Sequence, residues 1–309
     1  MRRNLVVVRA GDSSLHPSWL PPAGQRGWDL VVNYFGDDCE RHRAPDILRI
    51  DGKGPKWQGL HRLFTAHPQL LERYEYIWLP DDDLLVNPPD IDRLFALMRR
   101  HDLLLAQPAL TPQSHWSWTV TLRNPATTLR HTNFVEVMLP CFRADLLRRA
   151  LPGFAPYATG SGFDWAWPAM AGSAEGRVAV LDTVSATHTR PFGGPNYAFF
   201  AGRGYGAADE IGHVLATHGI AETATRILSL RTRLGLHLRG ESPAGRAVLR
   251  AGYRLAIAEA YLRRAPYRWE LQKRLGQNFA TPEAPVERME SNDGSRFAAA
   301  LARGDLAGS

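Results

Sequence analysis

The chain has 309 residues, of which 44% are hydrophobic and 22% are charged. These values are typical of a globular protein and exclude a disordered chain, a coiled coil and a disulfide-stabilised miniprotein. The formal net charge is +6, but residues 221–280 contain 12 basic and 4 acidic residues, so the rest of the chain is slightly acidic. An electrostatic argument for a polyanionic partner therefore applies only to this C-terminal stretch.

In the first 106 residues, short apolar runs alternate with amphipathic segments. Buried strands that alternate with helices indicate an α/β sheet that is at least partly parallel. We predict strands over residues 5–8, 28–35, 74–79 and 103–106 and helices over 57–67 and 90–100, the second helix with Asp90 as its N-cap.

The second half of the chain is less regular. Residues 108–133 are rich in Pro, Thr and Trp and predict a long loop or hairpin. Apolar spacing of three to four from residue 207 onward predicts a helical C-terminal part, whereas residues 281–309 are polar and predict a disordered tail. We predict strands over 133–142 and 178–181 and helices over 143–150, 222–236 and 244–264, with a further helix beginning near Asp164.

The cysteine content and the hydropathy restrict the compartment. Cys39 and Cys141 are too few and too far apart for a disulfide framework, so we expect two reduced thiols. The apolar run 5–8 ends at Arg9, so we expect no signal peptide. No segment approaches the ~20 apolar residues that a membrane-spanning helix needs. The sequence therefore predicts a cytoplasmic protein, with the inner face of the membrane as an alternative.

Acidic residues follow three predicted strands at the point where each strand ends. Carboxyl ends of parallel strands meet at one edge of a sheet, where clustered carboxylates repel one another unless a cation lies among them. Asp81 and Asp83 are two residues apart and point the same way in extended backbone, and paired oxygen ligands suit Mg²⁺ or Mn²⁺. The alternative for the segment 81–83 is a solvated acidic turn that binds no cation. The acidic residues that follow the three strands are Asp12, Asp37, Asp38, Asp81, Asp82 and Asp83.

The order of several motifs resembles the nucleotide-sugar transferases of GT-A fold, and most closely an uncharacterised domain family of plants and bacteria. These motifs are the valine-rich first strand, residues 53–60, the Asp81-x-Asp83 strand, residues 133–142, Gly162-Phe163-Asp164-Trp165 and His188. The resemblance covers roughly residues 4–200. It implies an α/β, GT-A-like sheet, mixed and mostly parallel, flanked by helices. We expect a GT-A-like catalytic domain over 1–206, a basic helical extension over 207–280 and a tail over 281–309.

The resemblance implies a metal-dependent glycosyltransferase that moves a sugar from a nucleotide-diphosphate donor to a hydroxyl acceptor. The acceptor would be a glycan, a lipid-linked molecule or an envelope component. Asp81, Asp83 and His188 would hold Mn²⁺ or Mg²⁺, with a polar strand-end residue as the alternative for His188. We expect nucleotide-sugar contacts from Arg9, Gly11, Asp12, Asp81, Asp82 and Arg190.

Lys53 and Lys56 are two of only three lysines in the chain. A flexible ammonium group on a glycine-rich turn at a helix start reaches a phosphate readily. The segment 52–56 lacks the Gly-Lys-Ser/Thr of a Walker loop, so this prediction does not extend to an NTPase. We therefore add Lys53 and Lys56 to the nucleotide-sugar contacts.

Two acidic residues are candidates for catalysis. The resemblance makes Asp164 the general base, a role that contributes about 10²–10⁴-fold to rate. The alternative is a helix cap. Glu136 interrupts an apolar run, and burying its charge would cost free energy. A functional role, such as contact with the acceptor or service as a second base, would explain its presence there. Its alternative is an outward-facing strand position.

Two other functions and one further partner remain open. A haloacid-dehalogenase-like phosphatase would use Asp81 as nucleophile, but Leu85 and the mid-chain position depart from that pattern. A non-catalytic sugar- or partner-binding protein on the same fold is the second. Arginine-rich C-terminal helices also predict peripheral contact with an anionic membrane, unless their apolar faces pack on the domain and leave the arginines solvated. We expect no nucleic-acid partner, because no binding motif accompanies the charge.

Overall fold

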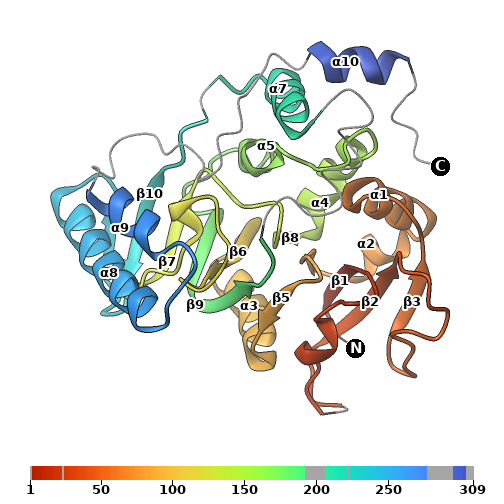
Figure 1. Cartoon of the computed structure of the whole chain (residues 1–309), viewed down its shortest axis with the longest axis horizontal. Helices are drawn as coiled ribbons and strands as arrows, with labels where there is room; N and C mark the ends of the chain where they lie inside the picture. Colours follow the sequence, from red (N-terminus) through yellow and green to blue (C-terminus); the bar gives the residue numbers. More distant parts are fainter. Residues whose placement is uncertain (1, 23, 192–205, 222, 277–294, 304–309) are drawn as a thin grey trace.

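The computed structural model describes residues 2–22, 24–191, 206–221, 223–276 and 295–303. Its centre is an eleven-stranded sheet in the order β11-β10-β7-β9-β6-β8-β4-β1-β2-β3, and β5 pairs with β9 beside this path (Figure 1). The N-terminal strands are parallel: β1 pairs with β2 and β4, and β2 pairs with β3. They are β1 (Asn4–Ala10), β2 (Trp28–Tyr34), β3 (Leu48–Asp51) and β4 (Tyr76–Trp78).

The remaining strands make the sheet mixed. β8 lies antiparallel between β4 and β6, and β9 runs parallel to β6 but antiparallel to β5 and β7. The hairpin of β10 and β11 joins the sheet through β7. These strands are β5 (Leu84–Val86), β6 (Leu105–Leu110), β7 (Thr127–Thr132), β8 (Cys141–Arg143), β9 (Val178–His188), β10 (Ile227–Thr232) and β11 (His237–Arg239).

Helices cover both faces of the sheet. Alternate residues of β1 point to opposite faces, so the strand contributes to a core on each side. Val6 and Val8 belong to a core with α3 (Pro88–Arg100), α8 (Pro243–Leu262) and α9 (Arg268–Gly276). Leu5 and Val7 belong to the opposite core. The helices there are α1 (Lys56–Ala66), α2 (Gln69–Arg73), α4 (Ala144–Ala150), α5 (Phe163–Met170), α7 (Ala207–Thr217) and α10 (Ser295–Ala302).

Three short 3₁₀ helices complete the described elements: η1 (His16–Trp19), η2 (Thr119–Thr121) and η3 (Leu151–Phe154). The α/β class and the helical flanks are confirmed. The C-terminal part is helical in α7, α8, α9 and α10, but it also contributes β10 and β11 to the sheet. Among the helices that the structure describes, none combines the length and the apolarity that crossing a bilayer requires.

Several local predictions are wrong. The predicted helix over 222–236 is instead strand over Ile227–Thr232, because hydrogen bonds to β7 outweigh a weak helical periodicity. The predicted strand over 133–142 is strand only at its end, in β8. Asp90 is not the N-cap of α3: Asn87 holds that position, and the helix begins at Pro88, whose ring suits a first turn.

The predicted disorder of 281–309 is wrong for the part that the structure describes. Residues 295–302 form α10, and the ring of Phe297 stacks on that of Tyr157 with centroids 5.1 Å apart. This buried aromatic contact provides the packing that the polar composition did not predict. Residues 281–294 and 304–309 lie outside the described residues.

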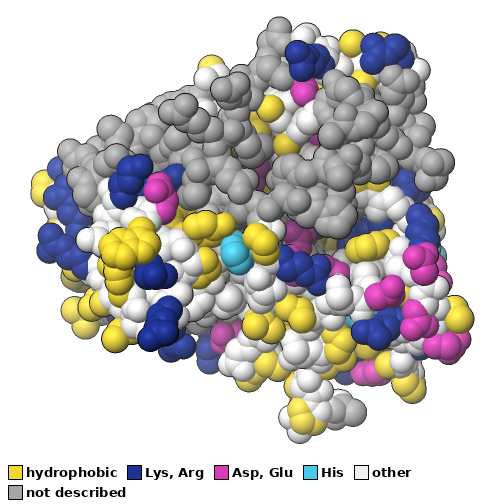
Figure 2. Space-filling view, in the orientation of Figure 1, with side chains coloured by type: hydrophobic (Ala, Val, Ile, Leu, Met, Phe, Trp, Pro, Cys, Tyr) yellow, Lys and Arg dark blue, Asp and Glu magenta, His cyan; other side chains and the backbone are white. Residues whose placement is uncertain are grey.

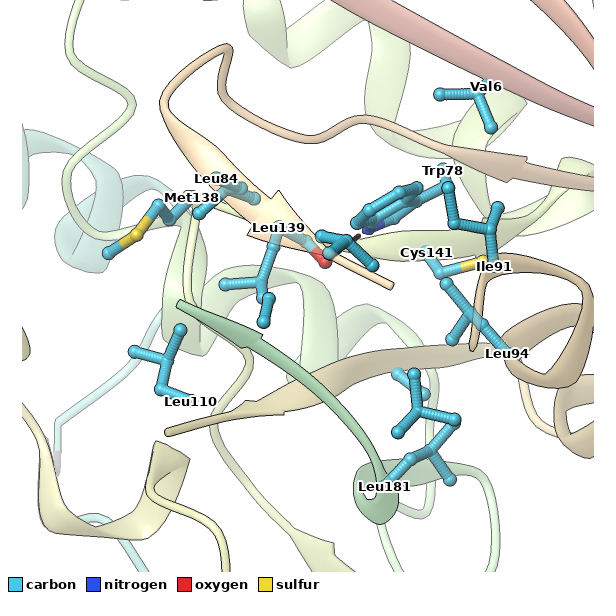
Figure 3. Close-up of a cluster of buried hydrophobic side chains, with 14 of the residues drawn as sticks. Val6, Trp78, Leu84, Ile91, Leu94, Leu110, Met138, Leu139, Cys141 and Leu181 are labelled. Atoms are coloured by element: carbon cyan, nitrogen blue, oxygen red, sulfur yellow. Dashed lines mark hydrogen bonds between the residues drawn. The ribbon is translucent and has the colours of Figure 1, made fainter. Parts of the chain in front are cut away.

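One hydrophobic cluster supports the edge of the sheet where β4 ends (Figure 3). Trp78 is buried there, and its indole Nε1 donates a hydrogen bond of 3.0 Å to the carbonyl oxygen of Leu139. Leu84 and Met138 pack in the same cluster. The cluster therefore holds the segment after β4 and the 133–140 loop against the same core.

Candidate functional site

The acidic segment, residues 81–83, lies where β4 ends. The backbone before it hydrogen-bonds to the 133–140 loop, and the backbone after it pairs with β9. The N–H of Leu79 donates to the carbonyl of Pro140 at 2.9 Å, and that of Asp81 donates to Met138 at 2.8 Å. The chain then enters β5, in which Leu84 is the register partner of His188. Asp81 therefore faces the 133–140 loop, whereas Asp83 faces the end of β9.

Asp83 and His188 form a close pair. His188 Nε2 lies 3.2 Å from Asp83 Oδ2, and the other ring nitrogen donates to the carbonyl of His115 at 2.8 Å. Burial alone would lower the pKa of His188, but the Asp83 carboxylate raises it above its ordinary value. Burial opposes ionisation of Asp83 as well, yet the hydrogen bond from His188 lowers its pKa. Asp83 Oδ1 is buried without a hydrogen-bond partner among the described residues.

Lys56 forms an ion pair with Asp81, the first acidic residue of the segment. Its ammonium lies 2.6 Å from Asp81 Oδ1 and donates to the carbonyl of Val137 at 2.8 Å. Burial still raises the pKa of Asp81, because Lys56 only partly offsets the loss of solvent and Asp83 adds like charge. Lys56 is the first residue of α1, so this helix delivers the cation to the end of β4.

Asp82 connects the acidic segment to the loop after β1. Its Oδ2 accepts a 2.8 Å hydrogen bond from the N–H of Gly11, and its Oδ1 lies 3.5 Å from Arg190 Nη1. Arg190 Nη2 also donates to the carbonyl of Ser13 at 2.9 Å. A side chain at residue 11 would place its Cβ 3.0 Å from the ring of Phe35, so glycine permits this close approach.

The two candidate catalytic acids meet at the 133–140 loop. Asp164, in the first turn of α5, accepts the N–H of Val137 at 2.9 Å, on the same residue whose carbonyl binds Lys56. Burial raises the pKa of Asp164 to about 6. Burial and the nearby Asp164 charge raise the pKa of Glu136 to about 8. Glu136 is buried in a loop and not on a strand, and its Oε2 has no hydrogen-bond partner among the described residues.

Three predicted contacts lie apart from this cluster. The Arg9 guanidinium is buried beneath the 52–54 loop, where it donates to Asn33 at 2.8 Å and to the carbonyl of Gly52 at 2.9 Å. Asp12 is exposed and accepts a hydrogen bond from Tyr34. Lys53 is exposed and lies 2.6 Å from Asp37, not from Asp81. The cluster consists of Gly11, Lys56, Asp81, Asp82, Asp83, Glu136, Asp164, His188 and Arg190, and we call it the β4-end site.

Residues that support the β4-end site were missed in the sequence. The carbonyl of His115 orients the His188 ring, and Gln107 Oε1 accepts the N–H of Glu136 at 2.7 Å. Gln107 is a buried polar residue in β6. In the sequence it directly follows the apolar run 103–106, and this position is the only signal for a buried polar role. His115 acts through its backbone, so its identity carries no signal.

The chemistry of the donors decides whether a divalent cation fits. Within the described residues, no group of three or more His, Cys, Asp or Glu side chains is close enough to hold a metal ion. Asp83 Oδ1, which is buried without a partner, and His188 Nε2 nevertheless offer one oxygen and one nitrogen. Mg²⁺ and Mn²⁺ sites commonly use one or two protein ligands and complete the shell with water and substrate phosphates. The pair fits such a cation, whereas Asp81 is held in the ion pair with Lys56 through Oδ1.

A family model described as "Protein of unknown function (DUF707)" matches residues 52–143 of the chain. This segment contains Lys56, Asp81, Asp83 and Glu136. The match confirms the resemblance to an uncharacterised domain family. No curated protein gives a match to the sequence.

Solved structures resemble the chain at low identity. Glucosyl-3-phosphoglycerate synthase from Mycobacterium tuberculosis, in complex with Mn²⁺, UDP-glucose and phosphoglyceric acid, is 16% identical, with 77% of this chain and 86% of that chain covered and a TM-score of 0.46. TarS from S. aureus is 13% identical, with 71% and 40% covered and a TM-score of 0.41. A mycobacterial protein is 16% identical, with 79% and 81% covered and a TM-score of 0.44.

Proposed function

We propose that the protein is a glycosyltransferase that uses a nucleotide-diphosphate sugar and a divalent cation, Mn²⁺ or Mg²⁺. The observation that carries this proposal is the pairing of Asp83 with His188 beside the Lys56–Asp81 ion pair. Asp83 and His188 carry oxygen and nitrogen atoms of the kind that bind metals, and the ammonium group of Lys56 lies beside them near the carboxyl end of β4, which supports the proposal. Such an edge of an α/β sheet is where ligands bind.

In this proposal the donor binds through its diphosphate. Asp83 and His188 hold the cation, which when bound stabilises the negative charge of the departing nucleoside diphosphate. Lys56 and Arg190 flank the acidic segment with positive charge, and such groups form strong hydrogen bonds to phosphate oxygens. Gly11 and Asp12 lie on the adjoining loop, where we assign them to the nucleoside, while Arg9 supports the neighbouring loop from beneath.

The acceptor hydroxyl would approach the 133–140 loop. At neutral pH Asp164, whose pKa is about 6, is ionised and able to accept a proton, whereas Glu136, whose pKa is about 8, is mostly neutral. Two carboxyl groups whose pKa values are pushed apart by their surroundings are suited to different roles. We therefore assign the general base to Asp164 and an acceptor contact to Glu136. The acceptor class is a glycan or a lipid-linked or envelope hydroxyl.

The test is donor turnover by the full-length protein with Mn²⁺. UDP-glucose is the first probe, because it accompanies Mn²⁺ in the mycobacterial synthase complex, and GDP-sugars follow. We expect release of the nucleoside diphosphate that depends on Mn²⁺ and is lost in Asp83→Asn. Asp46→Asn, which removes a half-exposed carboxylate paired with Arg26, is the matched control and should retain turnover.

Two results would redirect the proposal. Donor binding without turnover for any acceptor would leave a non-catalytic sugar-binding protein. A phosphoryl group trapped on Asp81 would instead indicate the phosphatase chemistry.

A further inference from the structure

A cavity lies away from the β4-end site, between α3, β7, β9 and the turn that joins β10 to β11. Its volume is about 840 Å³. The cavity is basic, since it has more arginine than acidic residues in its lining. The charged lining residues are Arg93, Arg100, Arg123, Arg231, Arg233, Asp90 and Asp182.

The two acidic residues neutralise only part of this charge. Asp182 is fully buried and paired with the buried Arg130 at 2.8 Å, and Asp90 pairs with Arg93 at 2.6 Å. Arg100 and Arg231 form no ion pair with any residue that the structure describes. Burial and the charges of these two arginines lower the pKa of His101, which lines the same cavity. An anion entering the cavity therefore meets at least two uncompensated guanidinium groups.

The β10–β11 turn presents apolar side chains beside this cavity. The N–H of Gly235 donates to the carbonyl of Thr232 at 3.0 Å, and Gly235 adopts a φ of +83°, so the turn is a closed, well-defined hairpin connection. Leu234 at its tip is 89% exposed and Leu236 is 57% exposed. A fixed turn that holds two leucines in water suggests that a partner covers them.

We propose that this corner docks on an anionic lipid surface, with a phosphate headgroup in the arginine-lined cavity and Leu234 and Leu236 at the acyl boundary. A soluble phosphate would explain the arginines alone, whereas a lipid explains the arginines and the leucines together. The combination of uncompensated positive charge and adjacent exposed leucines is what selects the lipid.

The neighbouring helix extends the same kind of surface. α8 packs against β10 and β11, and its outward side carries the exposed residues Arg254, Leu255 and Leu262. Figure 2 shows Lys and Arg side chains interspersed with hydrophobic ones where Figure 1 places α8 and α9. Membrane contact would therefore involve the hairpin first and this helix beside it.

The test is co-sedimentation of the full chain with vesicles of phosphatidylcholine alone or with 30% phosphatidylglycerol. We expect binding only to the anionic vesicles. Arg100→Gln with Arg231→Gln should weaken it about 30-fold, since each basic residue near an anionic leaflet accounts for about a fivefold change. Leu234→Ser with Leu236→Ser should also weaken it. The matched control, Arg148→Gln with Arg149→Gln, removes the same charge from α4 on the opposite face of the sheet and should bind normally.

Three outcomes would overturn the proposal: no binding to anionic vesicles, equal loss in the control, or no loss in the leucine variant. A calorimetric titration with inorganic phosphate distinguishes the sources. Phosphate binding that Arg100→Gln with Arg231→Gln abolishes, without any vesicle binding, would assign the cavity to a soluble phosphate and reject the lipid. Unchanged circular dichroism of each variant shows that it is folded. None of these measurements depends on donor turnover.

Discussion

His188 Nε2 lies 3.2 Å from Asp83 Oδ2 because β5 pairs with the end of β9 and sets Leu84 opposite His188. The two residues are more than a hundred positions apart in the sequence. A three-residue strand, too short to predict from periodicity, therefore joins the acidic segment to the only histidine of β9.

The first prediction concerns cation binding by this pair. His188→Gln removes a nitrogen donor, and we expect Mn²⁺ affinity to fall at least ~10-fold, since even partners outside the coordination shell contribute that much. The measurement is free Mn²⁺ by electron paramagnetic resonance. His67→Gln, at the C-terminal end of α1, is the control. Equal affinity in all three proteins would remove His188 from the metal site.

The second prediction concerns Asp164. Asp164→Asn should lower kcat by about 10²–10⁴-fold while the donor Kd stays within about twofold, because the amide cannot accept the proton. In the native protein kcat should fall about tenfold per pH unit below pH ~6, since the pKa of Asp164 is about 6 and only its ionised form acts.

Asp145→Asn is the matched control for that variant, since Asp145 occupies the first turn of α4 as Asp164 does in α5. Full activity in Asp164→Asn, or an unchanged acidic limb of the pH profile, would transfer the base to another group.

The third prediction concerns stability and pH. The pKa of Glu136 is raised from 4.5 to about 8 in the folded protein, so its neutral form favours folding. This contribution is complete below pH ~4.5 and is lost as the pH rises through about 8. Glu136→Gln should therefore be more stable than the native protein at pH 9 and similar to it at pH 5, as measured by urea unfolding. The exposed Glu40→Gln should show no such difference. A native advantage at pH 9 would contradict the burial of an uncompensated carboxyl group.

The fourth prediction concerns the buried ion pair between Arg130 and Asp182, which are both fully buried and joined by two hydrogen bonds of 2.8 and 2.9 Å. Arg130→Met should destabilise the protein by about 3–5 kcal/mol, because it leaves the buried Asp182 carboxylate without an opposite charge. Adding Asp182→Asn should recover part of this loss.

Urea unfolding of the two variants measures the effect. The exposed Arg43→Met, whose ion pair with Glu40 is 4.0 Å long, should cost less than ~1 kcal/mol. If the double variant is no more stable than Arg130→Met alone, the uncompensated charge is not the cause.

Prediction from the sequence succeeded where one segment contains its own signal. The valine-rich β1 and the amphipathic α1 and α3 follow from local periodicity. The position of the acids follows from an apolar strand that stops before Pro80. It failed over 227–232, where pairing with β7 makes a strand from a helix-like pattern. Likewise, Phe297 finds its partner Tyr157 only in the folded chain.

The sequence by itself determined the α/β class, the two-sided burial of β1 and the placing of Asp81 and Asp83 at the end of β4, because each depends on neighbouring residues along the chain. The tertiary structure decided which charges meet. It paired Lys56, not Lys53, with Asp81, and it brought His188 to Asp83. It also placed Asp164 against the loop that contains Glu136. Such contacts depend on strand order and register, which long-range packing sets and local patterns do not encode.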